Sequence, residues 1–381
     1  MFRKVIYLVK SNLHYYPPCM AQIQMLDDLG IEVEVWYGSS AQNALDILSK
    51  RGIKLVPLSD KRLGKRGKLD SLLNWLSFRS KTRQMLRSVN PKDTILWFGN
   101  VETLIPMIGL LGRFHYITSI LELLDDKAND LKRTLAMGLV RRADAVIACQ
   151  RTRAYIMRSW WKLDAVPYVM PNKPYQVEFA RNCQPGSELT GAYLRQFAGK
   201  KIVLFQGILQ HVQYLEEFAR ALRELDDDYL LVLMGSDERD KTLVGKVQAI
   251  YADTVHIPYI PAPSHLEITS HAHIGIVFYK DDSLNRAYCA PNKIYEYAHF
   301  GIPMIGNRIP GLQDTVGLVH AAECIELTAE QIIQAIHRIE ANYAQYSQNA
   351  SQFFADTDNY AVMQEILQKC SIDVRCRNNK D

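Results

Sequence analysis

The 381-residue sequence lacks several patterns by which a class of protein is usually recognised. It contains no Walker A loop, no Gly-x-Gly-x-x-Gly fingerprint and no Gly-x-Ser-x-Gly motif. These absences argue against a P-loop nucleotide hydrolase, a dinucleotide-dependent oxidoreductase and an α/β-hydrolase. No apolar run approaches the roughly 18 residues that a membrane span requires. Pro106 and Gly109 interrupt the longest candidate, 104–112.

Cysteine and metal-ligand patterns are also sparse. The seven cysteines are scattered and include no Cys-x-x-Cys pair, which indicates a reducing cytoplasm and argues against a disulfide framework or a zinc site. An Asp-x-Asp at 226–228 precedes an apolar run in a predicted turn, where we expect it to be solvated. The sequence therefore predicts no metal dependence. Residues 1–9 are too short for a signal peptide and predict a first strand.

Negative charge is scarce in the first half of the chain. Residues 1–175 hold 27 Lys and Arg against 15 Asp and Glu, whereas the remainder holds 18 against 26, so the net charge of +4 hides a strong asymmetry. Residues 50–92 alone carry 13 basic side chains and two acidic ones, with apolar and aromatic residues between them. A basic amphipathic stretch of this kind fits an anionic membrane surface, and no nucleic-acid-binding motif accompanies it.

We therefore predict that this stretch lies on an anionic membrane and that nucleic acid is not a partner. Phe78 is expected to insert beside the other contacts. The alternative is a solvated helix whose leucine and tryptophan face packs on its own domain. The residues predicted to contact the membrane are Lys61, Arg62, Lys65, Arg66, Lys68 and Trp75.

Composition and periodicity together predict two α/β domains. Hydrophobic residues make up 48% of the chain and charged residues 23%, which is enough to bury two cores at this length. Apolar runs alternate with helical patterns in both halves, and several runs are apolar on both faces, as strands of a parallel sheet are. The predicted strands are 5–9, 31–36, 94–98, 116–121, 145–148, 202–205, 230–233, 254–257, 274–278 and 304–305. The predicted helices are 20–29, 216–223, 332–340 and 360–368.

The predicted fold is therefore α/β, with two tandem doubly wound Rossmann-like domains and a ligand-binding cleft between them. The first domain is placed at 1–174 and the second at 200–355. The hinge or linker at 175–199 contains proline and glycine that interrupt the pattern. A C-terminal helix follows at 356–370, and residues 371–381 are expected to fray.

The most informative segment is Cys-Ala-Pro-Asn-Lys-Ile-Tyr-Glu-Tyr-Ala-His-Phe-Gly-Ile-Pro, which begins at residue 289. Pro291 suits the first turn of a helix, and Gly301 ends that helix. A helix start offers free N–H groups to a phosphate, and Lys293 adds a positive charge there. Glu296, one turn deeper, can accept two hydrogen bonds from a ribose diol. The alternative is a capped surface helix with an ion pair between the lysine and the glutamate.

Pro-Asn-Lys-x-x-Glu-Tyr followed by Gly-x-Pro resembles the nucleotide-sugar signature of retaining glycosyltransferases with the GT-B fold, in glycosyltransferase family 4. The resemblance spans nearly the full length and is specific mainly in 285–311. In that family the matching glutamate binds the donor ribose and the matching lysine lies near the diphosphate. The resemblance also implies that the helix at 356–370 crosses back to the first domain.

Further positions match the family with departures. Gly207 follows a strand and would let the backbone approach a phosphate, although an ordinary turn would serve as well. The donor is expected to contact Gly207, Tyr259, Asn285, Asn292, Lys293 and Glu296. Many family members place Arg directly after this glycine and Lys five residues beyond that Arg. They also place another glutamate eight residues before the one that matches Glu296. This chain has Ile208, Gln213 and Tyr288 at those places.

Two first-domain residues are candidates for the acceptor side. His14 follows the first strand and could move a proton or bind the acceptor, although a lone loop histidine is more often a surface residue. Glu122 ends the strand 116–121, within Leu-Glu-Leu, which resembles a His-Glu-Leu stretch of the family. The predicted catalytic residues are thus Lys293, Glu122 and His14.

The resemblance implies transfer of a sugar, with retention of configuration, from a nucleoside diphosphate sugar to a lipid-linked glycan. The expected setting is bacterial surface polysaccharide synthesis, on the cytoplasmic face of the membrane. The donor acts as co-substrate, and no cofactor or metal ion is expected. Two alternatives stay open: a nucleotide-sugar epimerase of the same fold, and a binding subunit without catalysis.

Overall fold

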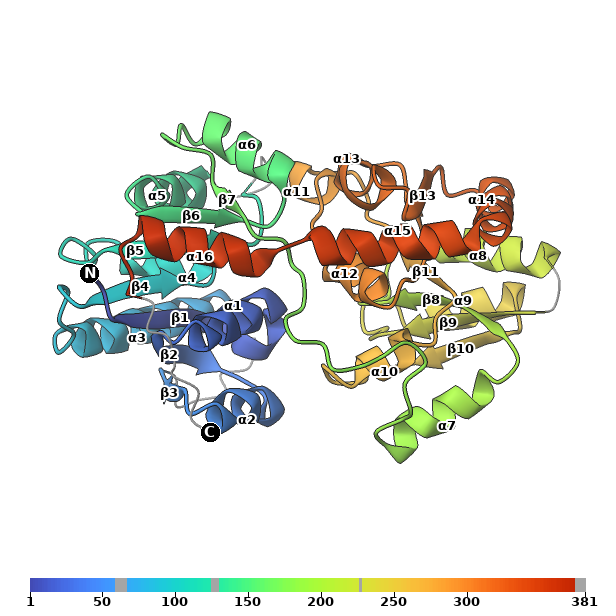
Figure 1. Cartoon of the computed structure of the whole chain (residues 1–381), viewed down its shortest axis with the longest axis horizontal. Coiled ribbons are helices and arrows are strands. Elements are labelled where there is room, and N and C mark those ends of the chain that lie inside the picture. Colours follow the sequence, from blue (N-terminus) through green and yellow to red (C-terminus); the bar gives the residue numbers. More distant parts are fainter. Residues whose placement is uncertain (59–66, 125–129, 226–227, 374–381) are drawn as a thin grey trace. The chain divides into compact units, whose positions relative to one another are not determined.

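The computed structural model of the chain describes residues 1–58, 67–124, 130–225 and 228–373 (Figure 1). The chain divides into two compact units. The first unit comprises Met1–Tyr175 together with the chain from Asp358 onward, and the second comprises Gln176–Thr357. The segment predicted as a linker, 175–199, therefore belongs with the second unit except for Tyr175, and it carries a helix of its own.

The first unit is built on a seven-stranded parallel sheet, ordered β3-β2-β1-β4-β5-β6-β7. Its strands are β1 (Lys4–Asn12), β2 (Glu32–Ser39), β3 (Lys54–Pro57), β4 (Thr94–Phe98), β5 (Tyr116–Ile120), β6 (Ala145–Ala148) and β7 (Tyr168–Val169). Its helices are α1 (Pro17–Asp28), α2 (Gln42–Lys50), α3 (Gly67–Leu86), α4 (Val101–Leu104), α5 (Asp130–Val140), α6 (Arg151–Trp160) and α16 (Asn359–Lys369), with 3-10 turns at Leu13–Tyr15 and Ile105–Met107.

The second unit is built on a six-stranded parallel sheet, ordered β10-β9-β8-β11-β12-β13. Its strands are β8 (Lys201–Gln206), β9 (Tyr229–Met234), β10 (Thr254–Ile257), β11 (Ile274–Val277), β12 (Met304–Asn307) and β13 (Ala322–Ile325). Its helices are α7 (Glu188–Gln196), α8 (Val212–Glu224), α9 (Leu243–Ile250), α10 (His265–Thr269), α11 (Leu284–Ala287), α12 (Asn292–His299), α13 (Pro310–Leu312), α14 (Ala329–Ala341) and α15 (Tyr343–Asp356), with a π turn at Gln313–Gly317.

The second sheet has the 3-2-1-4-5-6 strand order of a doubly wound fold and the first has the same order with a seventh strand added, so the predicted fold class is confirmed. The central strands β4, β5, β9 and β11 are buried on both faces, as their continuous apolar runs require. In β8, Ile202 and Leu204 pack into the cluster that includes α12, whereas Val203 and Phe205 pack into the cluster that includes α8. Successive side chains of a strand point to opposite faces, so each strand holds a helix layer on either side.

The last helix lies with the first unit, where α16 packs beside α1 (Figure 1). Asn359 anchors its start by donating from Nδ2 to the carbonyl oxygen of Pro171, 2.8 Å away. Beyond the helix, Phe2 pairs with Ile372 in a parallel bridge. The prediction that the tail frays from residue 371 is therefore wrong for 371–373, because backbone hydrogen bonds hold them, and 374–381 lie outside the described residues.

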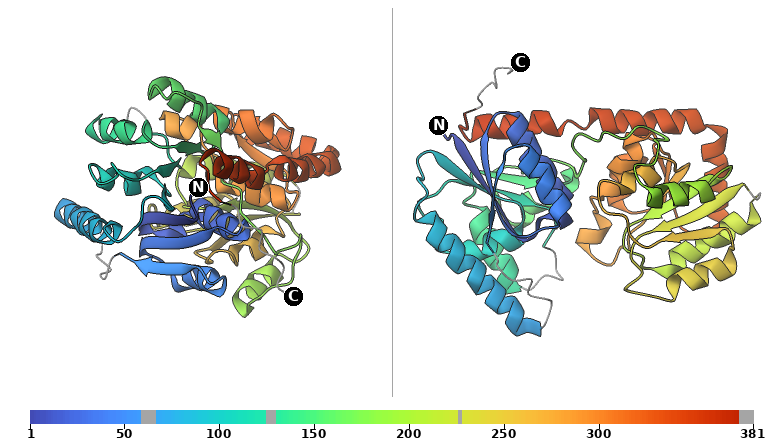
Figure 2. Two further views of the ribbon diagram at one scale, coloured as in Figure 1. Left: turned by 60° about the vertical axis from the view of Figure 1, so that its left-hand side comes forward. Right: turned by 90° about the horizontal axis from the view of Figure 1, so that it is seen from below.

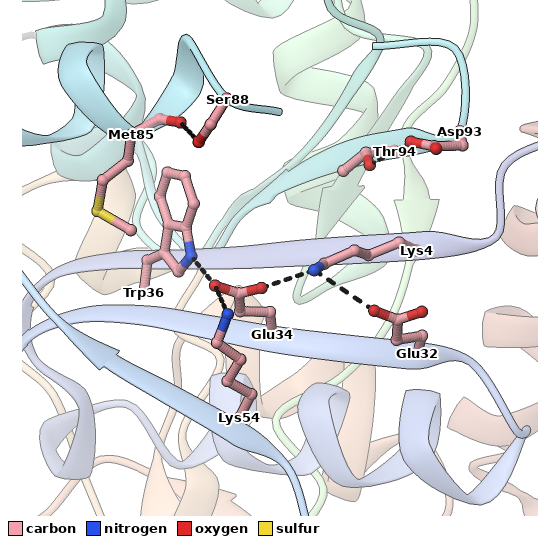
Figure 3. A network of polar contacts seen from close by, with 9 residues as sticks. All are labelled: Lys4, Glu32, Glu34, Trp36, Lys54, Met85, Ser88, Asp93 and Thr94. Carbon is pink, nitrogen blue, oxygen red and sulfur yellow. Dashed lines mark hydrogen bonds and ion pairs between the residues drawn. The ribbon is translucent and has the colours of Figure 1, made fainter. Parts of the chain in front are cut away.

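A buried carboxylate fixes the outer strands of the first sheet (Figure 3). Glu34 on β2 accepts from Lys4 Nζ at 2.6 Å and from Trp36 Nε1 at 2.9 Å, and Lys54 Nζ on β3 lies 3.2 Å away. Burial alone would raise the pKa of Glu34, but these three donors outweigh it and hold the pKa below its usual value. This cluster joins three neighbouring strands, so its role is structural.

The basic stretch of the sequence includes α3, which lies along one side of the first unit (Figure 2). Leu73 and Leu76 are exposed, and Trp75 is partly buried with the Arg79 guanidinium 5.9 Å from its ring centroid. Phe78 is 4% exposed, so the expectation that it inserts into a membrane is wrong. It lies on the inner face of α3, one turn from Thr82, whose side chain is also buried. None of the helices that the structure describes is long and apolar enough to span a membrane.

Candidate functional site

The strand order of the second unit reverses between β8 and β11, which lie side by side. Ligands of open α/β sheets bind beyond the carboxyl ends of the strands at such a switch point. Here β8 ends at Gln206 and β11 ends at Val277. The residues that follow these two strand ends, together with the start of α12, therefore form the candidate site.

Two glycines with positive φ lie at this edge of the sheet. Gly207 has a φ of +128°, and a Cβ built on it would lie 3.4 Å from Lys293 Nζ. Gly235, after β9, has a φ of +149°, and a Cβ there would lie 1.7 Å from the carbonyl oxygen of Gly207. Neither position accepts a side chain without strain or collision. The two turns thus pack backbone to backbone and leave Lys293 beside the bare chain at Gly207.

The helix α12 begins at Asn292. Pro291 was predicted to lie in the first turn of this helix, but it is the N-cap, one position before that turn. No described side chain caps its first-turn N–H groups. At the other end, Gly301 has a φ of +60° and donates to the carbonyl of Ala298, and Ile302 donates to that of Tyr297. This is a Schellman ending, so the predicted glycine stop is confirmed.

Lys293 projects from the first turn of α12 toward the end of β8. Its Nζ lies 4.3 Å from the ring centroid of Phe205 and 5.7 Å from that of Tyr279. Burial lowers the pKa of Lys293 to about 8, and the nearby Glu296 opposes this shift. A cation that has lost much of its hydration gains more from an anionic ligand than a fully solvated lysine does.

Glu296 faces the same strand end rather than Lys293. It accepts from Gln206 Nε2, and His265 Nε2 lies 3.5 Å from its Oε1. Gln206 is held in turn by Thr269, whose hydroxyl donates to Gln206 Oε1 at 2.7 Å. In the described part of the chain no ion pair joins Lys293 to Glu296, so the alternative of a simple surface ion pair is wrong. Both side chains instead face the strand edge.

Sequence reasoning missed the three side chains that position Glu296: Gln206, His265 and Thr269. Gln206 could have been found, because it stands directly before the glycine at a strand end. Nothing in the sequence marks the other two, which come from α10. His265 Nδ1 is buried and has no hydrogen-bond partner among the described residues.

The other predicted donor contacts stand at the same edge of the second unit. Tyr259 lies in the loop after β10 and is 66% exposed. Asn285 lies on α11, where Ser283 is the N-cap, and Asn292 opens α12. Both asparagines are partly buried.

The loop after Gly207 lacks the two cations of the family pattern, and cations of other loops stand near it. Ile208 is 49% exposed. Burial lowers the pKa of His211 in this loop, and Arg286 and Lys280 lower it further. Asp282 pairs with both of these residues, at 2.7 Å from Arg286 and 3.8 Å from Lys280. Their charge is therefore partly offset.

The acceptor-side candidates belong to the first unit. His14 lies in the 3-10 turn after β1, and its Nδ1 accepts from the backbone N–H of Ala41 at 2.9 Å. Burial lowers the pKa of His14, which agrees with a neutral ring that keeps its proton on Nε2. Glu122 is exposed, two residues beyond the end of β5. Both therefore stand beyond the carboxyl ends of first-sheet strands.

The structure describes only some of the residues that were predicted to contact the membrane. Lys61, Arg62, Lys65 and Arg66 lie outside the described residues, and Lys68 lies in α3 with its side chain outside them.

No protein-family model matches the chain, and no curated protein matches it. Solved structures do match over nearly the whole length. Sucrose-phosphate synthase from Thermosynechococcus elongatus is 15% identical with a TM-score of 0.68, over 97% of this chain and 98% of that one. HepE from Anabaena, solved with UDP-glucose, is 14% identical with a TM-score of 0.68, over 97% and 99%. A Listeria monocytogenes protein provisionally named a UDP-N-acetylglucosamine 2-epimerase is 11% identical with a TM-score of 0.63, over 97% and 96%.

The chain has the GT-B fold. Similarity at these identities establishes the fold and nothing finer. GT-B chains place two Rossmann-like domains in tandem, which is the architecture that the alternating pattern of the sequence predicted.

Proposed function

We propose that the protein is a glycosyltransferase that takes its sugar from a nucleoside diphosphate sugar bound by the second unit. The observation that carries the proposal is the arrangement at the end of β8. Lys293 stands beside the bare backbone of Gly207, and Glu296 is held one turn away by Gln206. A diphosphate at the start of α12 and a ribose at Glu296 would satisfy both side chains.

The proposed reaction retains the anomeric configuration, as in glycosyltransferase family 4, which this signature resembles. Negative charge grows on the diphosphate as it leaves the sugar. Lys293 and the uncapped N–H groups of α12 are aimed at that charge, and stabilisation of this kind is strongest where water is excluded. The proposal assigns no metal ion to this task, so activity should persist in excess EDTA.

The proposed acceptor is a lipid-linked glycan of bacterial surface polysaccharide synthesis, with the protein held at the inner face of the cytoplasmic membrane. His14 and Glu122 are the proposed acceptor contacts, because both stand at the carboxyl edge of the first sheet. The excess of basic residues in the first half of the chain supports the proposal that the protein acts at an anionic membrane surface.

Incubation with nucleotide sugars tests the reaction class. UDP-glucose is the first donor to try, because HepE was solved with it. Donor consumption only in the presence of a lipid-linked acceptor supports a transferase. Isomerised donor without any acceptor supports an epimerase, a class favoured by the Listeria similarity. Binding without turnover supports a binding subunit, in line with the missing cations at Ile208 and Gln213. A thermal-shift panel of UDP, GDP, ADP, CMP and dTDP would identify the base.

Donor affinity is expected to fall as pH rises through about 8. The pKa of Lys293 in the free protein is about 8, and the diphosphate binds the protonated amine. UDP-glucose keeps a constant diphosphate charge in this range, so its Kd should rise by up to about tenfold between pH 7 and pH 9. Calorimetric titration measures this. Lys293→Met should bind weakly with a flat profile, and the wild-type slope in that variant would assign the titration to another group.

Charge reversal in the basic stretch should release the protein from membranes. Wild type is expected to sediment with anionic vesicles at low salt, to dissociate as salt rises and to ignore neutral vesicles. Nucleotide binding should be unchanged, because it belongs to the other unit. The variant replaces Lys61, Arg62, Lys65, Arg66 and Lys68 with Glu. If it sediments as wild type does, these residues are an ordinary solvated surface.

A further inference from the structure

A hollow lined by arginines and apolar side chains lies in the first unit, far along the chain from the nucleotide candidates. It has a volume of about 320 Å³, and it lies between the C-terminal end of α3 and the loop before β5. Its polar lining consists of arginines alone: Arg83, Arg87 and Arg113. Its apolar lining consists of Leu86, Leu110 and Phe114. We call this hollow the arginine pocket.

The residues that the structure describes do not neutralise the positive charge of the arginine pocket. In the part of the chain that the structure describes, no carboxylate forms an ion pair with any of the three arginines. Arg113 is held in place, because it donates to the carbonyl oxygen of Leu86 and its guanidinium lies 4.9 Å from the ring centroid of Phe114. The other two guanidinium groups belong to exposed residues.

Compensation of the helix dipole does not account for this charge. A helix C-terminus carries roughly half a negative charge, and one nearby cation offsets it. Arg113 already contacts the last carbonyl of α3. Two further arginines beside it therefore leave an excess of about two positive charges in the pocket, which an anion would satisfy.

The position of the pocket separates it from the proposed chemistry. The chain runs from α3 into β4 and from Phe114 into β5, so the pocket lies at the amino edge of the first sheet. His14 and Glu122 follow the carboxyl ends of β1 and β5. The two sets stand at opposite edges of one parallel sheet, so the pocket belongs to a different site.

The exposed face of α3 continues the pocket with apolar side chains. Leu73 is 58% exposed and Leu76 is 47% exposed. With Arg83 they occupy positions i, i+3 and i+10 of α3, which fall on one helical face, and Arg87 follows in the turn directly after the helix. This face therefore presents the two leucines first and Arg83 about 10 to 15 Å further along. Figure 2 shows α3 along the side of the unit.

We propose that this face docks on an anionic membrane and that the arginine pocket takes the headgroup phosphate of one phospholipid. Guanidinium forks match phosphate oxygens in pairs, and the apolar lining fits the carbon chain beside a headgroup phosphate. Leu73 and Leu76 enter the interfacial layer. The inference rests on the proposed function in one respect, that the protein acts at a membrane. It adds a defined phosphate site to the general electrostatic attraction expected of residues 61–68.

The test uses the full-length protein and vesicles of phosphatidylglycerol in phosphatidylcholine at fixed ionic strength. Arg83→Gln with Arg87→Gln removes two pocket charges, and neither side chain forms a hydrogen bond with another residue that the structure describes. Arg142→Gln with Arg158→Gln is the matched control, since both are exposed arginines of the same unit outside the pocket. We expect the pocket variant to lose about tenfold or more in vesicle affinity and the control to lose little. Adding Arg113→Gln should deepen the loss.

Equal losses of vesicle affinity in the two variants would mean that diffuse charge attraction holds the protein on the membrane. This result would overturn the proposed phosphate site. Inorganic phosphate supplies the second arm. If it stabilises the wild type but not the pocket variant, while vesicles bind neither, the pocket serves a soluble phosphate compound and the lipid assignment fails. UDP titration of the same samples keeps the two proposals apart. A protein that binds UDP but no vesicle loses only the lipid site, and one that binds vesicles but no nucleotide loses only the proposed function.

Discussion

Lys293→Ala is expected to lower kcat by about 10²- to 10³-fold, the usual cost of removing one group that stabilises a developing negative charge. The donor KM should change less, because the charge on the leaving diphosphate is greater in the transition state than in the bound donor. The position of Nζ beside Gly207 and the pKa of about 8 place a poorly hydrated cation at the predicted diphosphate. Steady-state kinetics with the donor identified by thermal shift measures both constants.

Lys280→Ala is the matched control for this substitution. Lys280 belongs to the same unit, but its amine lies 3.8 Å from Asp282 and its charge is already partly offset. We expect a change of less than about threefold in kcat, as for other exposed ion pairs. An effect of Lys293→Ala on KM alone would show that this lysine only grips the donor and takes no part in the chemical step.

Glu296→Ala is expected to weaken nucleotide binding by about 1.5–3 kcal/mol, or roughly 10- to 150-fold in Kd, the range for hydrogen bonds to a charged group. The carboxylate is held by Gln206 and His265, so it is already oriented before the ribose arrives. Calorimetric titration with UDP measures the loss. The melting temperature should change little, because Glu296 lies at the edge of the unit rather than in its core.

A modified ligand makes this test specific for the ribose. Wild type should bind 2′,3′-dideoxy-UDP more weakly than UDP, whereas Glu296→Ala should bind both alike, since the diol and the carboxylate act on each other. Glu330→Ala, on the outer helix α14, controls for the loss of one negative charge from the unit. If the variant still discriminates between the two ligands, the diol contacts another residue and the assignment of Glu296 is wrong.

The fold was predictable because it depends on local patterns. Apolar runs such as 145–148 and 254–257 were predicted with the bounds that the structure shows. The strands that sequence reasoning missed are β3, β7 and β13. β7 has two residues and β3 is a partly exposed edge strand, so neither carries the continuous apolar run of a buried strand. The linker 175–199 was marked by proline and glycine, but α7 packs against α10 and joins it to the second unit.

The site was predictable only in the part that one helix supplies. Lys293 and Glu296 lie three residues apart, and their shared face follows from helix geometry alone. Gly301 likewise marks the end of α12 by its need for a positive φ. The sequence by itself thus determined the alternation of strands and helices, the tandem arrangement of two doubly wound domains, and a charged pair at one helix start.

Tertiary structure decided what that pair contacts. Gln206 reaches Glu296 across 90 residues of chain, and Thr269 and His265 join them from a short helix with no sequence signal. Tertiary packing also buried Phe78 on the inner face of α3. Likewise, it gathered three arginines from two separate segments into one pocket. Sequence periodicity reports which face of an element is buried, but the neighbours of that face come from sheet order, which depends on contacts between distant segments.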